Sequence, residues 1–282
     1  MSVGPGRIDV VATPIGNLAD LSPRARDTLA QADLIAAEDT RHTGALLRHL
    51  GIDKLLVSLH EYNEGRRVDE LLAALARGSR VAVVSDAGTP LVSDPGYVLV
   101  RAALDAGYAV HAVPGPSALL AALASSGLAA DRFCFEGFLS AREGTRRERL
   151  RELALETRTM VFFEAPHRIV EALQSMAAEW GETRQACVAR EISKAHESLY
   201  RGTLAQLLDI AGKDTNFARG EITVVVAGAQ VQDTAPDDAF VARAFAILRE
   251  ELPPSRAAAL VAQLTGRRKA EVYALTRTVP DP

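Results

Sequence analysis

Seven ionisable residues follow closely after apolar runs of the sequence. Their side chains are of the kinds that take part in catalysis. The candidates for catalysis are Glu38, Asp39, Arg41, His42, Glu164, Arg190 and Lys194. Carboxylates, imidazoles and amines can take or give a proton, and a guanidinium can hold a phosphate through its fork of N–H groups. Each residue alone could instead cap a helix or face solvent. The sequence leaves the choice of a general base open.

Three loops rich in glycine and proline also follow apolar runs. They are Thr13–Leu18, Ser85–Pro90 and Pro114–Ala118. Glycine and proline let a backbone approach a ligand closely and hold irregular turns rigidly. One such loop is most often only a tight turn. Three of them at one edge of a sheet favour a shared ligand.

Several common motifs for nucleotide binding, nucleophilic catalysis and zinc binding are missing from the sequence. The chain has no G-x-G-x-x-G after its first strand, no P-loop motif, no G-x-S-x-G and no histidine pair with a third zinc ligand. The two cysteines, Cys134 and Cys187, lie in apolar runs and indicate buried thiols in a reducing cytoplasm. No metal is needed for the chemistry predicted below, and we expect none.

Composition indicates a globular chain. Its 282 residues are 48% hydrophobic and 24% charged, with a net charge of -4. No apolar run approaches the roughly 20 residues of a membrane span, and the N-terminus has no signal-peptide pattern. We therefore predict a cytoplasmic protein with no membrane partner. Any nucleic acid must bind to local basic surface, because the whole chain is slightly acidic.

Strand and helix patterns alternate through the first third of the chain. The expected strands are Ile8–Ala12, Leu34–Ala37, Leu55–Leu59, Val81–Val84 and Ala109–Val113. Apolar strands alternating with helices predict a parallel α/β sheet. The ionisable residues and the glycine-rich loops then meet at the carboxyl ends of the strands, where such sheets bind ligands.

The rest of the chain divides into a second α/β block and a helical tail. The expected strands of the block are Phe133–Phe138, Met160–Phe163, Ala186–Ala189 and Ile222–Ala227, in a mixed sheet. A polar linker, Val231–Asp238, precedes three helical patterns, the last two arranged like a helix-turn-helix. We predict domains over 1–118, 119–230 and 237–282.

The sequence resembles a known family through its loops and three further runs. Leu34–Leu47 reads LIAAEDTRHTGALL, Phe162–Arg168 reads FFEAPHR, and Val188–His196 contains VARE and ISKAH. With the three loops, these runs are similar to the ribosomal RNA small subunit methyltransferase I family, in the tetrapyrrole-methylase superfamily. That family methylates the ribose 2′-oxygen of a cytidine in 16S rRNA. The resemblance covers about Asp9 to Gly228 and continues more weakly into the tail.

The resemblance implies two α/β domains with S-adenosylmethionine in the cleft between them, a homodimer, and the decoding region of 16S rRNA or the small ribosomal subunit as partner. Its cofactor-binding positions fall on Pro14, Gly16, Asp86, Gly88, Thr89, Ser117, Ala118, Phe163, Ala189 and Glu221. Methyl transfer to a ribose hydroxyl asks the protein to align the oxygen, exclude water and assist loss of a proton.

Two basic segments are candidates for RNA contact. The run from Arg142 to Arg151 interleaves arginine with glutamate, which favours a solvated helix. In the tail, Arg267, Arg268 and Lys269 open the last helix, and Arg256 and Arg277 add to its positive charge against Glu271 and Asp281. We predict that Arg267, Arg268 and Lys269 bind RNA phosphate. The alternative is a packing or oligomer element.

Two other functions fit parts of this pattern. A C-methyltransferase of tetrapyrrole precursors would share the cofactor cleft but would not need a basic tail. A non-catalytic RNA-binding assembly factor would keep the fold, but charged residues gathered in a cleft are costly without a use.

Overall fold

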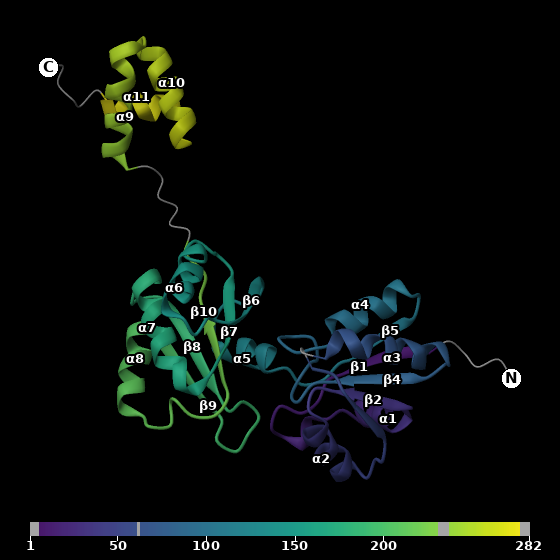
Figure 1. Cartoon of the computed structure of the whole chain (residues 1–282). Coiled ribbons are helices and arrows are strands. Elements are labelled where there is room, and N and C mark those ends of the chain that lie inside the picture. Colours follow the sequence, from purple (N-terminus) through teal and green to yellow (C-terminus); the bar gives the residue numbers. More distant parts are fainter. Residues whose placement is uncertain (1–5, 61–62, 231–236, 277–282) are drawn as a thin grey trace. The chain divides into compact units, whose positions relative to one another are not determined.

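The computed structural model describes residues 6–60, 63–230 and 237–276 (Figure 1). The chain divides into two compact units, Met1–Ala229 and Gln230–Pro282. Residues 231–236 of the predicted linker, Arg277 and Asp281 lie outside the described residues. Within the described part of the chain, no helix is both long and apolar enough to cross a membrane.

A parallel sheet forms the first half of the larger unit. Its strands are β1 (Arg7–Val11), β2 (Leu34–Ala37), β3 (Leu55–Ser58), β4 (Arg80–Val84) and β5 (Ala109–Val113). They pair in the order β3-β2-β4-β1-β5, and every pairing is parallel. All the predicted strands of this sheet are therefore confirmed, with ends displaced by one residue at most.

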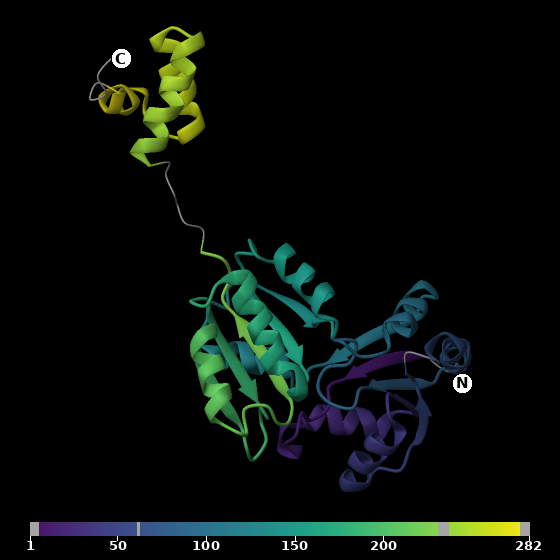
Figure 2. The same ribbon diagram turned by 60° about the vertical axis from the view of Figure 1, so that its left-hand side comes forward.

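Helices cover both faces of this sheet. They are η1 (Leu18–Asp20), α1 (Pro23–Gln31), α2 (Thr40–Leu50), α3 (Glu64–Ala76) and α4 (Tyr97–Asp105). Leu29 of α1 and Leu47 of α2 pack against one face, whereas Leu71 of α3 and Leu99 of α4 pack against the other. Ser22 caps α1 and Pro23 is its first residue. The result is a three-layer α/β arrangement (Figure 2).

A mixed sheet forms the second half. Its strands are β6 (Phe133–Phe138), β7 (Thr159–Glu164), β8 (Gln185–Arg190), β9 (Ser198–Thr203) and β10 (Ile222–Val226), in the order β6-β7-β10-β8-β9. β6 and β7 are parallel and the other pairs are antiparallel. The predicted mixed sheet is confirmed. Strand β9 was not predicted, because its sequence SLYRGT lacks an apolar run.

Helices also cover both faces of the mixed sheet. They are α5 (Ala118–Ser126), α6 (Glu143–Glu152), η2 (Pro166–Arg168), α7 (Ile169–Trp180) and α8 (Leu204–Lys213). Leu123 of α5 packs on the face that carries Ala189, and Leu173 of α7 packs on the opposite face with Val188. The two α/β halves confirm the predicted fold class for this part of the chain.

The smaller unit is a helical cluster of α9 (Asp238–Glu251), α10 (Pro254–Thr265) and α11 (Lys269–Thr276). Its core is formed by Val241, Ala258, Val261 and Val272, with Phe245 and Tyr273 packed edge to face beside them. Gly266, in the left-handed conformation, ends α10 and begins the turn into α11. The three helical patterns of the tail are thus confirmed.

Candidate functional site

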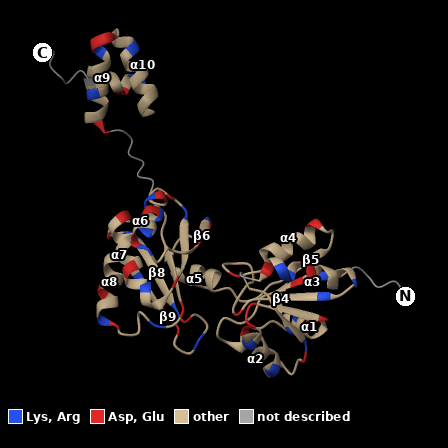
Figure 3. Ribbon diagram, in the orientation of Figure 1, with Lys and Arg blue, Asp and Glu red and all other residues tan. Residues whose placement is uncertain are grey.

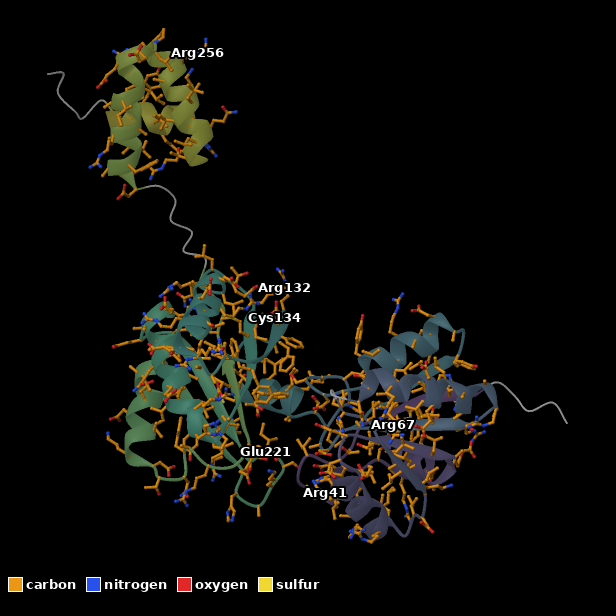
Figure 4. The ribbon with its side chains drawn as sticks, in the orientation of Figure 1. Arg41, Arg67, Arg132, Cys134, Glu221 and Arg256 are labelled. Carbon is orange, nitrogen blue, oxygen red and sulfur yellow. The ribbon has the colours of Figure 1, made fainter. Side chains whose placement is uncertain are left out.

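A cavity of about 330 Å³ lies at the carboxyl ends of the parallel strands and is closed by the second sheet. The loops after β1, β4 and β5 supply one wall, and the ends of β7 and β8 with the start of β10 supply the other. Seven predicted cofactor positions line it: Gly88, Thr89, Ser117, Ala118, Phe163, Ala189 and Glu221. Glu221 marks the second half's side of this region in Figure 4. The cavity therefore joins residues from distant parts of the sequence.

The other three predicted cofactor positions do not line this cavity. Pro14, Gly16 and Asp86 line an adjoining cavity of about 320 Å³ together with His42. The loop after β1 separates the two cavities, because Ile15 faces the first while both of its neighbours face the second. The sequence placed these residues in one group since it could not show which side of the loop each one faces.

The three glycine-rich loops hold one another in place. Thr13 and Gly88 form a backbone bridge, with N···O distances of 2.8 and 3.0 Å. The Thr13 hydroxyl donates to the Ser85 carbonyl oxygen, and the Thr89 hydroxyl donates to the Pro116 carbonyl oxygen, each at 3.2 Å. These bonds cross-link the loops after β1, β4 and β5. The rim of the cavity is therefore held together by hydrogen bonds between the loops.

Lys194 lies at the contact between the two halves. A Cβ atom on Gly16, whose φ is +135°, would come within 2.3 Å of the Lys194 side chain. The Lys194 ammonium pairs with Glu191 at 2.9 Å and with Glu221 at 3.0 Å. Burial alone would lower the pKa of Lys194, but these two carboxylates raise it. Lys194 is therefore a charged clamp between the loops and not a neutral base.

Glu38, Asp39 and Asp86 connect the ends of β2 and β4. The Asp86 backbone N–H donates to Glu38 Oε2 at 3.2 Å, and the Asp39 backbone N–H donates to Asp86 Oδ1 at 3.0 Å. Among the described residues, no group of three His, Cys, Asp or Glu forms a metal-binding cluster. The carboxylates therefore orient two loops beside the cavities.

Asp39 and Arg41 form a capping pair at the start of α2. Asp39 Oδ1 accepts the Arg41 backbone N–H at 2.8 Å, and its Oδ2 pairs with the Arg41 guanidinium at 2.7 Å. The hydrogen bonds from Arg41 hold the pKa of Asp39 well below its usual range. The Arg41 side chain is 89% exposed and is labelled in Figure 4. This geometry favours the capping alternative over proton transfer.

Glu164 and Arg190 end the strands on either side of Ile222, and both lie on the face of the second sheet opposite Phe163 and Ala189. Glu164 ends β7, is buried, lines the first cavity and pairs with Arg168 at 2.9 Å. Arg190 is also buried, but it lies on the side of this face that carries β9. There it lies beside Tyr200 and Asp214. The structure thus brings Glu164, but not Arg190, to the cavity.

Asp94 is a cavity residue that the sequence reasoning did not single out. It lines the first cavity beside Thr89 and Ser117. Burial raises the pKa of Asp94 to about 6, the Ser85 hydroxyl opposes that shift, and the charges of Glu38 and Asp86 add to it. Asp94 lies four residues beyond the Ser85–Pro90 loop, and no spacing in the sequence marks it as a site residue.

Glu64 anchors the segment that carries Asp94. This buried carboxylate on α3 accepts the backbone N–H groups of Gly96, Val98 and Leu99 through Oε1, at 3.1, 2.9 and 3.2 Å. The segment also contains Leu91 and Ser93 at φ of 73° and 64°, which non-glycine residues rarely adopt. A fixed anchor at its end keeps this strained turn in place.

The predicted RNA-binding residues of the tail are partly engaged within the smaller unit. Arg267 pairs with Asp238 at 2.6 Å, and the Lys269 ammonium donates to the Ser255 hydroxyl at 2.9 Å. The Arg268 backbone N–H donates to Glu271 at 3.2 Å. Basic and acidic residues are interspersed over these helices (Figure 3). The basic surface of this unit is therefore smaller than its sequence suggests.

The arginines of the basic run in α6 bind acidic or polar side chains of the same unit. Arg147 and Arg151 both bind Glu179, and Arg149 binds Glu136. Arg146 is buried and donates to the Ser175 hydroxyl at 3.0 Å. The helix alternative for this run is confirmed, although Arg146 is a packing residue and not a solvated one.

Comparisons with known proteins assign the chain to a family. Residues 7–208 match the tetrapyrrole (corrin/porphyrin) methylases, and residues 234–276 match the RsmI C-terminal HTH domain. A ribosomal RNA small subunit methyltransferase I from Xylella fastidiosa (strain Temecula1) is 51% identical, over 95% of this chain and 98% of that protein.

Two solved structures share the fold of the larger unit. The methyltransferase CobJ matches with a TM-score of 0.60 and 23% identity, over 79% of this chain and 95% of that one. A uroporphyrin-III C-methyl transferase from Thermus thermophilus, complexed with S-adenosyl homocysteine, matches with a TM-score of 0.55 and 21% identity, over 78% and 97%. With the sequence relatives, they lead to one conclusion: the chain belongs to the ribosomal RNA small subunit methyltransferase I family, within the tetrapyrrole methylases.

Proposed function

We propose that this enzyme transfers a methyl group from S-adenosylmethionine to the ribose 2′-oxygen of a cytidine in the decoding region of 16S rRNA. Membership of the family makes it a methyltransferase of small-subunit rRNA that uses this cofactor. The cytidine and the 2′-oxygen are the finer part of the proposal. The observation that carries it is the cavity between the two α/β halves, with Asp94 on one wall and Glu164 and Glu221 on the other.

The cavity fits the cofactor's mixed chemistry. Its size lies in the lower part of the range for small-molecule sites, about 300–1,000 Å³. Phe138 and Phe163 offer apolar surface suited to a purine, and the small side chains of Gly88 and Ala118 leave backbone groups accessible. When bound, S-adenosylmethionine supplies an electrophilic methyl group. The protein's remaining task is to hold the ribose oxygen in line and to remove its proton.

Asp94 is our candidate for taking that proton. It lines the proposed cofactor cavity, and a pKa raised to about 6 leaves its carboxylate ionised at neutral pH but more basic than an ordinary aspartate. The negative charges of Glu38 and Asp86 raise its proton affinity further. Glu164 also lines the cavity, but its ion pair with Arg168 ties it to a structural role.

The smaller unit is proposed to bind rRNA phosphate through Arg267, Arg268 and Lys269. Its sequence match to a helix-turn-helix domain supports a nucleic-acid role. The Arg267–Asp238 pair limits how much free charge it offers. We keep 1–118, 119–230 and 237–282 as the proposed domains, and the ribosomal substrate as the reason for a cytoplasmic location.

A homodimer is also proposed. Helix α4 exposes Tyr97, Val98 and Leu104, with 68%, 47% and 53% of their surfaces open to solvent. Phe133 and Phe138 of the edge strand β6 are exposed as well. An apolar helix face of this kind is suited to a second copy of the chain.

One assay tests the function and its rivals. Tritiated S-adenosylmethionine is incubated with small ribosomal subunits, free 16S rRNA or a porphyrinogen, and each product is counted. Label in the RNA supports the proposal. Label only in the porphyrinogen favours a tetrapyrrole methyltransferase, and label in no acceptor favours an assembly factor.

A further inference from the structure

A loop of the second half reaches the first half beside the proposed cofactor cavity. It spans residues 191–197 between β8 and β9, and we call it the clamp loop. The Ser193 hydroxyl donates to the Asp20 carboxylate of η1, and the Lys194 side chain lies directly against Gly16. Figures 1 and 2 both show this loop beside the segment that follows β1. The clamp loop therefore joins the two α/β halves.

The backbone of the clamp loop is held in an uncommon conformation. Glu191 and Ser193 have φ of 53° and 68°, a region that non-glycine residues rarely adopt. The Glu191 backbone N–H donates to the Glu221 carbonyl oxygen at 2.9 Å. The Ser193 backbone N–H donates to Glu197 Oε2 at 2.7 Å. These bonds hold the loop in the shape that brings Ser193 and Lys194 to the first half.

Lys194 connects the two walls of the cofactor cavity. Its methylene groups lie against Gly16, and the neighbouring Ile15 lines the cavity from the first half. Its ammonium pairs with Glu191 and with Glu221, which lines the cavity from the second half (Figure 4). One side chain therefore contacts both sides of the cavity, and the separation of the walls depends on where it lies.

A groove of about 470 Å³ adjoins the cofactor cavity at this contact. Ile15, Ser117 and Ile192 line both the groove and the cavity, so these residues separate the two. Asp20 and Ser193 line the groove but not the cavity, and Asp20 is exposed to solvent. Breaking the Ser193–Asp20 hydrogen bond would free Ile192 to move away from Ile15 and would open the cavity toward the groove.

The contacts of the clamp loop are of a kind that can break and form again. The Glu221 side chain is 69% exposed, so water screens its ion pair with Lys194. Such ion pairs are weak, and the Ser193–Asp20 hydrogen bond also lies beside solvent. A ligand held between two halves must leave through an opening of this kind, and such openings often limit product release.

We propose that the clamp loop holds the two walls together around the cofactor, with Ser193 and Lys194 as positioning residues, and that its release from Asp20 and Gly16 lets S-adenosylhomocysteine leave. This inference rests on the proposed function, because that function places the cofactor in the first cavity. It adds a step to the reaction cycle: the opening of the clamp loop sets how long the product stays bound.

The test measures how fast S-adenosylhomocysteine binds to and leaves the immobilised full chain, by surface plasmon resonance. Lys194→Met keeps the aliphatic chain but removes the charge, Lys194→Arg restores a charge, and Ser193→Ala removes one hydroxyl group. Lys213→Met is the matched control. Lys213 also lies in an ion pair, with Asp209, but it lines neither cavity nor the groove.

We expect Lys194→Met and Ser193→Ala each to raise the dissociation rate constant by about tenfold, while the association rate constant changes by less than about threefold. Lys194→Arg should lie closer to the wild type than Lys194→Met, and Lys213→Met should match the wild type. A merely structural role would instead lower the fraction of protein that binds and leave dissociation from the remainder unchanged.

A double-mutant cycle tests the contact between the halves itself. Asp20→Ala and Ser193→Ala remove the same hydrogen bond from opposite sides. The Asp20→Ala/Ser193→Ala double variant should therefore release S-adenosylhomocysteine no faster than either single variant.

Two results would overturn the inference. One is a wild-type dissociation rate constant in both Lys194→Met and Ser193→Ala. The other is additive effects of Asp20→Ala and Ser193→Ala, since the two residues would then act separately. Ser193→Ala is so small a change that it tests the clamp loop even where Lys194→Met destabilises the fold. None of these measurements uses RNA, so a failure of the proposed function would appear separately, as a wild type that methylates no 16S rRNA.

Discussion

At the scale of single residues, Asp94 lies between the proposed cofactor cavity and the carboxylates at the ends of β2 and β4. Its burial near Glu38 and Asp86 makes it a stronger base than a solvated aspartate. A base of this kind works only in its deprotonated form. Catalysis that depends on it is lost as the pH falls through the pKa.

Asp94→Asn should therefore remove both the rate and its pH dependence. We expect kcat of the wild type to rise between about pH 5 and pH 7, centred on the pKa of about 6, and turnover of the variant to fall by roughly 10²-fold or more. Single-turnover methylation across this pH range is the measurement. A variant that keeps the same acidic limb would show that another group takes the proton.

The sequence predicted that the candidate site lies at the ends of the strands. It did not predict that the residues there line two separate cavities. The apolar runs before Asp86 and Ser117 correctly predicted strand ends at one edge of a sheet. Which side of the loop Ile15 or Gly16 faces depends on its tertiary contacts, and no local pattern encodes that. Asp94 looks like an ordinary turn residue before proline until the chain folds back over the strand ends.

At the scale of elements, Glu64 connects helix α3, which packs on the first sheet, to the segment that lines the first cavity. Its carboxylate takes the place of a capping residue for α4, because Gly96 has no side chain to accept the first N–H groups. No pattern in the sequence pairs residue 64 with residue 96. The leucine stripe that is typical of a helix in this segment begins only at Leu71.

Removing this anchor should loosen the segment that carries Asp94. Glu64→Ala should lower the free energy of unfolding by about 2–4 kcal/mol, because three backbone N–H groups, two of them buried, lose their acceptor, and should weaken S-adenosylhomocysteine binding. Glu64→Gln keeps an oxygen and should have a smaller effect on both. Thermal unfolding and calorimetry measure the two quantities. Equal, wild-type cofactor affinity in both variants would mean that the segment holds its shape without Glu64.

Helix α4 should also define the subunit contact. A Val98→Asp/Leu104→Asp double variant places charge on its exposed apolar face and should shift the protein from dimer to monomer in light scattering after gel filtration. A wild type that elutes as a monomer would contradict the dimer itself.

At the scale of the whole molecule, we propose that the two units have different functions. Both cavities are formed by residues of Met1–Ala229, whereas the helix-turn-helix match lies in the smaller unit. The sequence marks a helical tail after a polar linker, and the domains 1–118, 119–230 and 237–282 stay a prediction. It overstated the free charge of the smaller unit, because the Arg267–Asp238 pair joins residues 29 positions apart.

A chain ending at Ala229 should bind S-adenosylhomocysteine like the full chain but bind 16S rRNA more weakly. For each phosphate that the shorter chain no longer binds, the slope of log affinity against log salt should fall by roughly 0.7 to 0.9. The measurement is a salt titration of RNA binding for both chains. Coincident slopes would remove the smaller unit from the RNA interface and favour a packing role.

The central claim is tested most directly by identifying the methylated nucleoside. Small ribosomal subunits that lack the modification are incubated with the enzyme and S-adenosylmethionine, and the 16S rRNA is digested and analysed by mass spectrometry. The account predicts one new 2′-O-methylcytidine per subunit, absent with Asp94→Asn. A methyl group on a base carbon or nitrogen, or on the ribose of another nucleotide, would contradict it.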